Sequence, residues 1–532
     1  MNLRLTGGEM PLWSDLDGRH GPGPVHGRVL TPLLAGAAGR TLVVGPLDPA
    51  LLDTVPTDDL TVLVRGLADA EALAARLAGR PGAVVLCGGP ERLATEPAYD
   101  TVLALDGLER LRSTEGADLT WDETLTLLVA ALRPGGALLL AVENHLGLHR
   151  LVAAPAAVTD SQWATVGEYD SGRPAGLARL RARLTDAGLH VTDAHTVWPT
   201  PLAPTVLLSP GLLADPEAVG FLQATLGRAC AGWPEALTDP GRLAATAVRH
   251  GAATELAPAW ILRAERATLG WGGSDRAGDD AAGSARRAGA APSGPGGGAG
   301  RPVGLVALGD DHFDLVDRPA GRPLVRRPDG TTTPVPTGRT LEDLLIGAAL
   351  RHDLPTVREL LHRWQASRHA GVPADQVVAT LGGGLAPLVP ALPPGSALRH
   401  LAVRLIDAGL AHLWPSPADP VELALTLAAL AGSAFEPVPP TDDASTRADT
   451  PSYRELLATR DRLARELGEA REREEWYERT LAAREGELRR AREIVALLSG
   501  TPTARAGRLV LAGARRARRT AGAAVRRVLP RD

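Results

Sequence analysis

Short apolar runs recur through the first half of the chain, and segments with helical spacing separate them. Six runs predict strands, at 41–44, 60–64, 83–86, 101–105, 137–142 and 191–197. Intervening segments such as 69–77 and 121–132 place apolar residues at helical spacing. Pro134, Gly135 and Gly136 predict a turn between the helical segment at 121–132 and the next strand. The run at 137–142 lacks polar residues, which is typical of a strand buried on both faces of a parallel sheet. The alternation predicts βαβ units and an α/β fold with a doubly wound, Rossmann-like sheet.

The pattern also divides the chain into segments. Residues 1–39 predict a mainly helical lead-in with a helix at 29–38, and 40–269 predict the sheet domain, with further strands at 204–208 and 260–262. Residues 270–302 are rich in Gly, Ala, Ser and Asp and predict a disordered linker. A smaller, mainly helical α+β domain is expected at 303–436, with a few antiparallel strands at 303–325 and helices at 341–366, 397–411 and 420–431, then a polar linker at 437–450.

Residues 451–500 follow a heptad pattern, and 452–498 contain no Pro. With Tyr453 and every seventh residue at position a, and Leu456 and every seventh residue at position d, most of these positions are apolar. Arg460, Glu474 and Arg484 interrupt the series. Sustained heptads favour a coiled coil over a single charged helix, so we expect a homo-oligomer formed through 451–500.

The C-terminal tail, 501–532, is strongly basic. It carries nine arginines against one acid, Asp532, with apolar residues between them. Two interpretations are open: a basic amphipathic helix on an anionic membrane surface, through 505–531, or a solvated, partly disordered tail. Nucleic-acid binding is not expected, because the tail lacks aromatic residues for base stacking.

The composition indicates the cellular compartment and excludes few classes of function. The chain has 532 residues and a net charge of −5, which gives no general attraction to nucleic acid or membrane. Its two cysteines, Cys87 and Cys230, cannot form a disulfide framework and are typical of a reducing compartment. With neither a signal-peptide pattern nor a long uncharged apolar stretch, we expect a cytoplasmic protein.

Polar residues stand where two predicted strands end. Asp106 follows the strand at 101–105, and Glu143 and Asn144 follow the strand at 137–142. Ligands of open α/β sheets bind at the carboxyl ends of the strands, so these three residues are the catalytic candidates, for example as a general base. His145 and His149 have the spacing of two metal ligands on a helix, but no third ligand stands nearby, so no metal site is expected.

Residues 40–265 resemble the class I S-adenosylmethionine-dependent methyltransferases, which are doubly wound sheets. TLVVGPLD at 41–48 stands at the family's first strand and glycine loop, LTVLVRG at 60–66 at strand two, and VVLCGGPERL at 84–93 at strand three. Residues 99–111 and 132–144 correspond to strands four and five. ENHLGLH at 143–149 is similar to a signature of methyltransferases linked to bacterial surface glycans.

The resemblance implies S-adenosylmethionine as the cofactor. It places the cofactor contacts at Gly45, Asp48, Arg65, Gly89, Glu91 and Asp106. The chain departs from the family at two of them. Only Gly45 of the glycine loop is present, and Val43, Leu47 and Pro49 replace the acid and the other glycines. Arg65 stands where the family has a carboxylate for the ribose hydroxyls, and a guanidinium cannot accept those hydrogen bonds. An arginine there suits the 2′-phosphate of NADP, but the glycine pattern of that fold is absent.

Two functions follow from these residues. The first is methyl transfer from S-adenosylmethionine to an oxygen or nitrogen of a saccharide or small metabolite, with reduced or lost activity as a variant. The second is a catalytically inactive, methyltransferase-derived scaffold or assembly subunit that self-associates through its C-terminal coiled coil. The loop chemistry at Gly45 and Arg65 separates the two.

Overall fold

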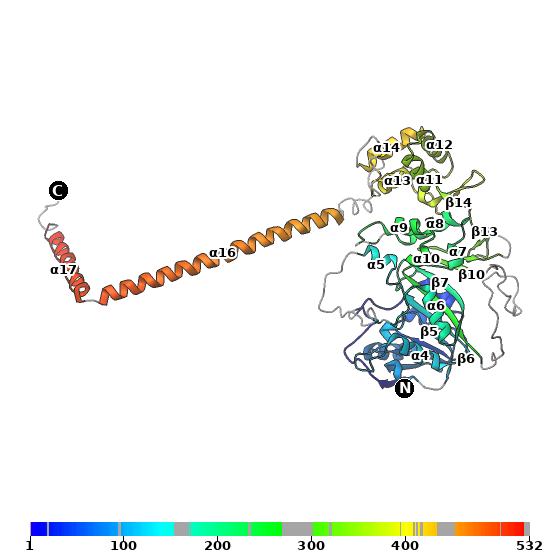
Figure 1. Ribbon diagram of the computed structural model, residues 1–532, viewed down its shortest axis with the longest axis horizontal. Helices are drawn as coiled ribbons and strands as arrows, with labels where there is room; N and C mark the ends of the chain where they lie inside the picture. The colour runs from blue at the N-terminus through cyan, green and yellow to red at the C-terminus, as the bar shows by residue number, and fades with distance from the viewer. Residues whose placement is uncertain are drawn as a thin grey trace, which may run out of the picture. The chain divides into compact units, whose positions relative to one another are not determined.

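The computed structural model describes residues 2–18, 21–93, 97–153, 170, 172–231, 233, 236–268, 302–318, 322–393, 395–407, 410, 413–414, 419–433, 453–500 and 502–525. The chain divides into two compact units, Met1–Pro439 and Pro440–Asp532 (Figure 1). The predicted linkers lie outside the described residues, except that Pro302 already belongs to a strand.

A thirteen-stranded sheet organises the described part of the first unit. Its strand order is β1-β4-β3-β2-β5-β6-β9-β7-β8-β10-β11-β12-β13. The strands are β1 (Leu3–Gly7), β2 (Thr41–Val44), β3 (Leu60–Val64), β4 (Val84–Gly88), β5 (Tyr99–Ala104), β6 (Leu132–Glu143), β7 (Leu189–Trp198), β8 (Val206–Leu208), β9 (Ala259–Arg266), β10 (Pro302–Leu308), β11 (Asp311–Val316), β12 (Leu324–Arg326) and β13 (Thr332–Pro334).

The parallel half of this sheet confirms the α/β prediction. Strands β4, β3, β2, β5 and β6 pair in parallel. If these five strands are numbered from 1 to 5 along the chain, starting at β2, their order across the sheet is 3-2-1-4-5. This is the order of a doubly wound Rossmann-like sheet. The chain changes direction across the sheet between β2 and β5, which makes their carboxyl ends the switch point where ligands of such folds bind.

Burial on both faces explains the apolar runs. Successive residues of β6 alternate between two cores, with Leu138 and Leu140 in one and Leu139 in the other. The first core lies under α4 (Trp121–Ala131) and α6 (Leu177–Asp186). The second lies under α1 (Thr31–Leu34), α2 (Pro49–Leu52) and α3 (Leu67–Arg76). A strand with helices on both sides has no solvent face, so polar alternation is absent.

Two expectations for this half are wrong. The lead-in is not mainly helical: residues 3–7 form β1, which pairs in parallel with β4, and the predicted helix at 29–38 shortens to the 3-10 turn Arg28–Leu30 and α1. The predicted turn at 134–136 is a bulge inside β6, because Tyr99 pairs with Leu132 while Thr101 pairs with Ala137. Glycines in a strand commonly mark such irregularities.

The other half of the sheet is antiparallel. Strand β9 runs antiparallel to both β6 and β7, and β8 joins β7 to β10. Strands β10 to β13 then form an antiparallel meander, as expected for 303–325. They continue the main sheet, however, so the predicted domain boundary at 303 does not separate two sheets. The pairing of β8 with β10 is long-range in sequence, and local hydrophobic patterns carry no information about it.

Further helices complete the first unit. Near the antiparallel half lie α5 (Leu148–Val152), α7 (Pro210–Leu213), α8 (Val219–Ala229), α9 (Pro240–Arg249) and α10 (Ala253–Leu256). A third core gathers α11 (Leu341–Leu350), α12 (Leu354–Gln365), α13 (Ser396–Asp407) and α14 (Pro420–Ala431). These helices lie in the segments expected to be helical at 341–366, 397–411 and 420–431, although α13 ends at Asp407. A small sheet of β14 (Gly338–Thr340), β15 (Val377–Thr380) and β16 (Leu385–Pro387) accompanies them.

The described part of the second unit forms two helices, α16 (Tyr453–Gly500) and α17 (Pro502–Val525). The heptad segment is thus helical over residues 453–500, while its pairing stays a prediction. In α17 the side chains of 505–519 are exposed, and membrane contact likewise stays a prediction. No helix within the described ranges is long and apolar enough to span a membrane.

Candidate functional site at the carboxyl ends of the sheet

Gly45 begins the loop that leaves the central strand β2. Its φ is +87°, a left-handed conformation that glycine adopts at little cost. A Cβ at this position would lie 3.4 Å from Asp106 Cβ and from Leu111 Cδ2. The surviving glycine of the predicted loop is therefore needed for its conformation, and an added Cβ would be in close contact with both side chains. It lies next to Asp106, at the switch point that the sequence predicts.

Arg65 follows β3 and is held by the lead-in. Its Nε donates to Asp15 Oδ2 at 2.8 Å, its Nη2 to Asp15 Oδ1 at 2.7 Å, and its Nη1 to the carbonyl of Arg112 at 2.9 Å. The side chains of Arg65 and Asp15 are only 11% and 4% exposed. The guanidinium that replaces the family's carboxylate thus has its own internal carboxylate partner.

The lead-in is fastened across the strand ends by several contacts. The amide of Met10 donates to the carbonyl of Arg65 at 2.9 Å, and the amide of Val25 donates to the carbonyl of Pro46 at 3.0 Å. Asp69, in the first turn of α3, accepts from the amide of Asp15 at 2.7 Å and from the hydroxyl of Ser14. Burial raises the pKa of Asp69. Met10, Asp15 and Val25 therefore lie across the carboxyl ends of β3 and β2.

Asp106 is engaged in a second buried ion pair. Arg110 Nε donates to Asp106 Oδ2 at 2.6 Å, and Arg110 Nη1 donates to the carbonyl of Gly23 at 2.7 Å. Burial raises the pKa of Asp106 to about 7, although the Arg110 guanidinium opposes this shift. Asp106 lies where the sequence predicts, but its two oxygens are occupied by Arg110 and are not available to a substrate.

These groups meet around one closed hollow. It is lined by Asp15, Gly45, Pro46, Leu63, Val64, Arg65, Gly88, Arg110 and Leu111, and it has no space for a water molecule. The structure thus brings the predicted residues Gly45 and Arg65 together, with Asp106 beside them. It also fills the space between them with the chain's own ion pairs.

S-adenosylmethionine does not fit this arrangement. Its ribose needs an acceptor at the end of β3, whereas Arg65 offers only donors and these are already bonded. Its methionine part needs open backbone beside Gly45, where Pro46 and the lead-in residue Val25 are paired. Binding would require the lead-in to leave the strand ends.

The remaining predicted cofactor contacts have local structural roles. Asp48 caps α2, since its Oδ1 accepts from the amide of Ala50 at 2.7 Å. Glu91 accepts from the amide of Ala117 at 3.1 Å, and a Cβ on Gly89 would collide with its carboxylate. None of the three residues, Asp48, Gly89 and Glu91, lines the closed hollow.

Glu143 and Asn144 also lie away from the hollow. Glu143 Oε1 is hydrogen-bonded to His149 Nε2 at 2.8 Å and to Arg150 Nε at 2.7 Å. Desolvation raises the pKa of Glu143, but these two bonds outweigh it and bring the pKa to about 2. Asn144 is buried and donates to the carbonyls of Glu255 at 2.7 Å and Ala257 at 2.8 Å. Both side chains therefore hold the chain after β6 in place.

His149, which has metal-ligand spacing to His145, is hydrogen-bonded to Glu143 in the structure. Among the residues that the structure describes, no group of three or more His, Cys, Asp or Glu side chains could hold a metal ion.

The sequence did not predict the roles of Asp15 and Arg110. Arg110 had a local signal, because it follows Asp106 by four residues, the spacing of a helical ion pair. Asp15 had none, because it is 50 residues from Arg65.

Comparisons with known proteins add little to this geometry. No family model matches the chain, and no curated protein matches it. Among solved structures, the [4+2]-cyclase SpnF matches at 19% identity over 45% of this chain and 80% of its own, with a TM-score of 0.25. The N-methyltransferase NodS from Bradyrhizobium japonicum matches at 14% identity over 45% and 93%, with a TM-score of 0.25. A complex of the Haloferax volcanii Trm112 methyltransferase activator with a methyltransferase matches at 17% over 45% and 89%, with a TM-score of 0.28. Scores this low carry no argument about function.

Proposed function

We propose that this chain is a non-catalytic assembly subunit built on a methyltransferase-like sheet, and that it does not transfer methyl groups from S-adenosylmethionine. One observation carries the proposal: the buried ion pair of Arg65 with Asp15 occupies the end of β3, where the cofactor's ribose would lie. The strand order supports descent from a methyltransferase sheet, and the closed hollow supports loss of the cofactor.

The energies favour the closed state. Breaking a buried ion pair by removing one partner costs about 3–5 kcal/mol. A cofactor that displaced Asp15 from Arg65 would meet a cost of this order, which weakens binding by roughly a hundredfold or more. It would also have to displace the backbone bonds of Met10 and Val25. Affinity in the micromolar range is therefore not expected.

The assembly part of the proposal rests on α16. Its apolar a and d side chains Leu463, Leu467, Tyr477, Leu481, Leu488 and Val495 are each more than half exposed in the single chain. An apolar stripe at heptad spacing is stabilised when a second helix covers it. Glu474 and Arg484 interrupt the stripe, and Arg484 pairs with Glu487 of its own helix at 2.9 Å.

Charges beside the stripe favour a parallel, in-register dimer. In that arrangement a g residue faces the e residue of the next heptad on the partner helix. Arg473 would face Glu478 of the second copy, and Glu487 would face Arg492 of the second copy; all four side chains are exposed. Each of these facing pairs is of opposite charge, so this register is stabilised.

The loss of cofactor binding is tested by calorimetric titration of the full chain with S-adenosylmethionine and S-adenosylhomocysteine. We expect no saturable heat and no thermal shift at millimolar ligand. Micromolar binding would contradict the proposal and would support the other function, methyl transfer, for which a saccharide or metabolite acceptor stays a prediction. A control variant, Arg65→Asp with Asp15→Asn, restores an acceptor at the end of β3 and reports whether this position alone excludes the cofactor.

Assembly is tested by light scattering on the full chain. We expect a dimer that becomes a monomer when Leu481 and Leu488 are both changed to Arg. The matched control changes Ala482 and Ala483 to Arg, which adds the same charge on the outer face and should leave the dimer intact. A Val495→Cys variant should form a disulfide between two copies only if the helices are parallel; Cys87 and Cys230 are buried and do not compete. A monomeric wild-type chain would overturn this part alone.

A further inference from the structure

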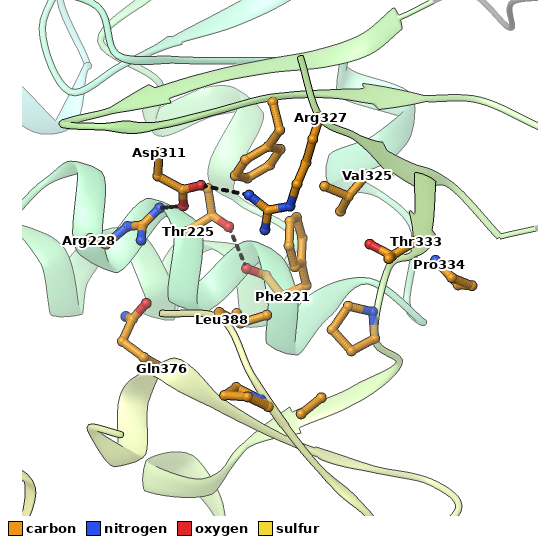
Figure 2. Close-up of a pocket in the computed structure, with 14 residues that line it drawn as sticks. Phe221, Thr225, Arg228, Asp311, Val325, Arg327, Thr333, Pro334, Gln376 and Leu388 are labelled. Carbon is orange, nitrogen blue, oxygen red and sulfur yellow. Dashed lines mark hydrogen bonds and ion pairs between the residues drawn. The ribbon is translucent and has the colours of Figure 1, made fainter. Parts of the chain in front are cut away.

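A cavity of about 200 Å³ lies in the first unit, away from the closed hollow (Figure 2). Its walls come from α8, from the antiparallel strands β11 to β13, and from the segment that includes Gln376 and β16. It is smaller than the cavities that hold drug-sized molecules, which are roughly 300–1,000 Å³. A ligand of about amino-acid size suits it.

Two arginines and one aspartate form the polar wall. Arg228 Nη2 donates to Asp311 Oδ2 at 2.7 Å, and Arg327 Nη1 lies 3.3 Å from Asp311 Oδ1, as the dashed lines of Figure 2 show. One carboxylate is thus shared between two guanidinium groups. The lining residues carry a surplus of one positive charge, because they include no other acid or base.

Arg228 also has an unused donor. Its Nε is buried and has no hydrogen-bond partner among the described residues. A buried donor without an acceptor is costly, so the Arg228 side of the cavity wall has hydrogen-bonding capacity that the described residues do not satisfy. The Thr225 hydroxyl donates to the carbonyl of Phe221 at 2.9 Å and does not accept from Arg228 Nε.

Much of the remaining lining is apolar and aromatic. The rings of Phe221 and Phe313 are 6.3 Å apart between centroids and tilted by 57°, and Arg327 lies over the Phe313 ring at 6.0 Å. Val325 and Leu388 extend this surface. A cationic ligand is disfavoured, because Asp311 is already engaged twice. A bare inorganic anion would leave the apolar wall uncovered.

We propose that this cavity binds a small organic monoanion, with a carboxylate on Arg228 and Arg327 and an apolar or ring-shaped body against Phe221, Phe313 and Leu388. Guanidinium groups bind carboxylates through charge-assisted hydrogen bonds. The site is independent of the closed hollow, so its test does not depend on whether the chain binds S-adenosylmethionine.

The first test titrates the full chain with three probes: benzoate, benzyl alcohol and inorganic phosphate. We expect saturable binding of benzoate, and at least tenfold weaker binding of benzyl alcohol, which has the ring but no charge. Phosphate should also bind at least tenfold more weakly, because it lacks the apolar body. Three results would each overturn the proposal: benzyl alcohol binds as tightly as benzoate, phosphate binds as tightly as benzoate, or benzoate shows no saturable binding.

Variants locate the site. Arg327→Gln and Arg228→Gln should each weaken benzoate binding at least tenfold. The matched control is Arg326→Gln, since Arg326 is the adjacent residue but pairs with Asp314 at 2.8 Å and does not line the cavity. Asp311→Asn removes the competing carboxylate and should tighten benzoate binding severalfold. If the control weakens binding as much as the cavity variants, or if Asp311→Asn weakens it, the proposal is wrong. Arg327 is half-exposed, so its variant keeps the test valid if the Arg228 variant does not fold.

Discussion

Arg65 and Asp15 form a two-pronged ion pair across the end of β3, with N–O distances of 2.8 and 2.7 Å. The indole ring of Trp13 lies 5.1 Å from the guanidinium carbon, so the arginine is also covered from the lead-in side. This relationship closes the part of the sheet where a doubly wound fold binds its ligand. The Arg65–Asp15 ion pair therefore determines whether this end of the sheet can hold a cofactor or is filled by the chain's own side chains.

Asp15→Ala should destabilise the chain by about 3–5 kcal/mol, because it leaves the Arg65 charge buried without its partner. The control is Asp59→Ala, which removes the exposed partner of Arg40 at 3.6 Å and should cost less than about 1 kcal/mol. Urea unfolding of both variants measures the difference. Equal, small effects would show that the lead-in is not fastened by this pair.

Glu143→Gln should remove a stabilisation that depends on pH. The folded pKa of about 2 lies below the ordinary value of 4.5, so the ionised carboxylate stabilises the fold above pH 4.5 and this contribution disappears as the pH falls toward 2. The side chain is 34% exposed, and solvent screening reduces the expected effect to about 1 kcal/mol. The wild type should exceed the variant in stability at pH 6, and the gap should narrow by pH 3. A gap that does not change with pH would contradict this prediction.

Gly45→Ala should destabilise the chain by more than about 1–2 kcal/mol, the usual penalty for a left-handed alanine. The added Cβ also meets Asp106 and Leu111 at 3.4 Å. Gly188→Ala is the matched control, because its φ is +80° and nothing lies within 4 Å of the added carbon. Thermal unfolding should show a larger loss for Gly45→Ala, and the excess over the control measures the crowding at the switch point.

Asn144→Ala should cost about 1–3 kcal/mol, since the carbonyls of Glu255 and Ala257 lose their side-chain donor inside the protein. Asn144→Asp should cost more, because a carboxylate there would face the same two carbonyl oxygens without a donor. Chemical denaturation checks both. An unchanged stability with Ala would return Asn144 to the list of candidate functional residues.

Much of the fold could be predicted because its determinants are local. The runs at 41–44 and 60–64 coincide with β2 and β3, and α14 spans the predicted 420–431. Errors arose where pairing is long-range: residues 3–7 form a strand only because β4 lies beside them, and β10 continues the main sheet only through β8.

The candidate site likewise has features that the sequence determines locally and features that depend on long-range contacts. The sequence by itself determined that Gly45, Arg65 and Asp106 follow neighbouring strands and that an arginine replaces the expected carboxylate, because strand ends and residue identities are local facts. Only the tertiary structure decided that Asp15 neutralises this arginine and that Arg110 pairs with the carboxylate of Asp106. It also decided that no space for a ligand remains between these two ion pairs. The physical reason is that an ion pair and an enclosed volume depend on distances through space, and the lead-in reaches the strand ends from 50 residues away.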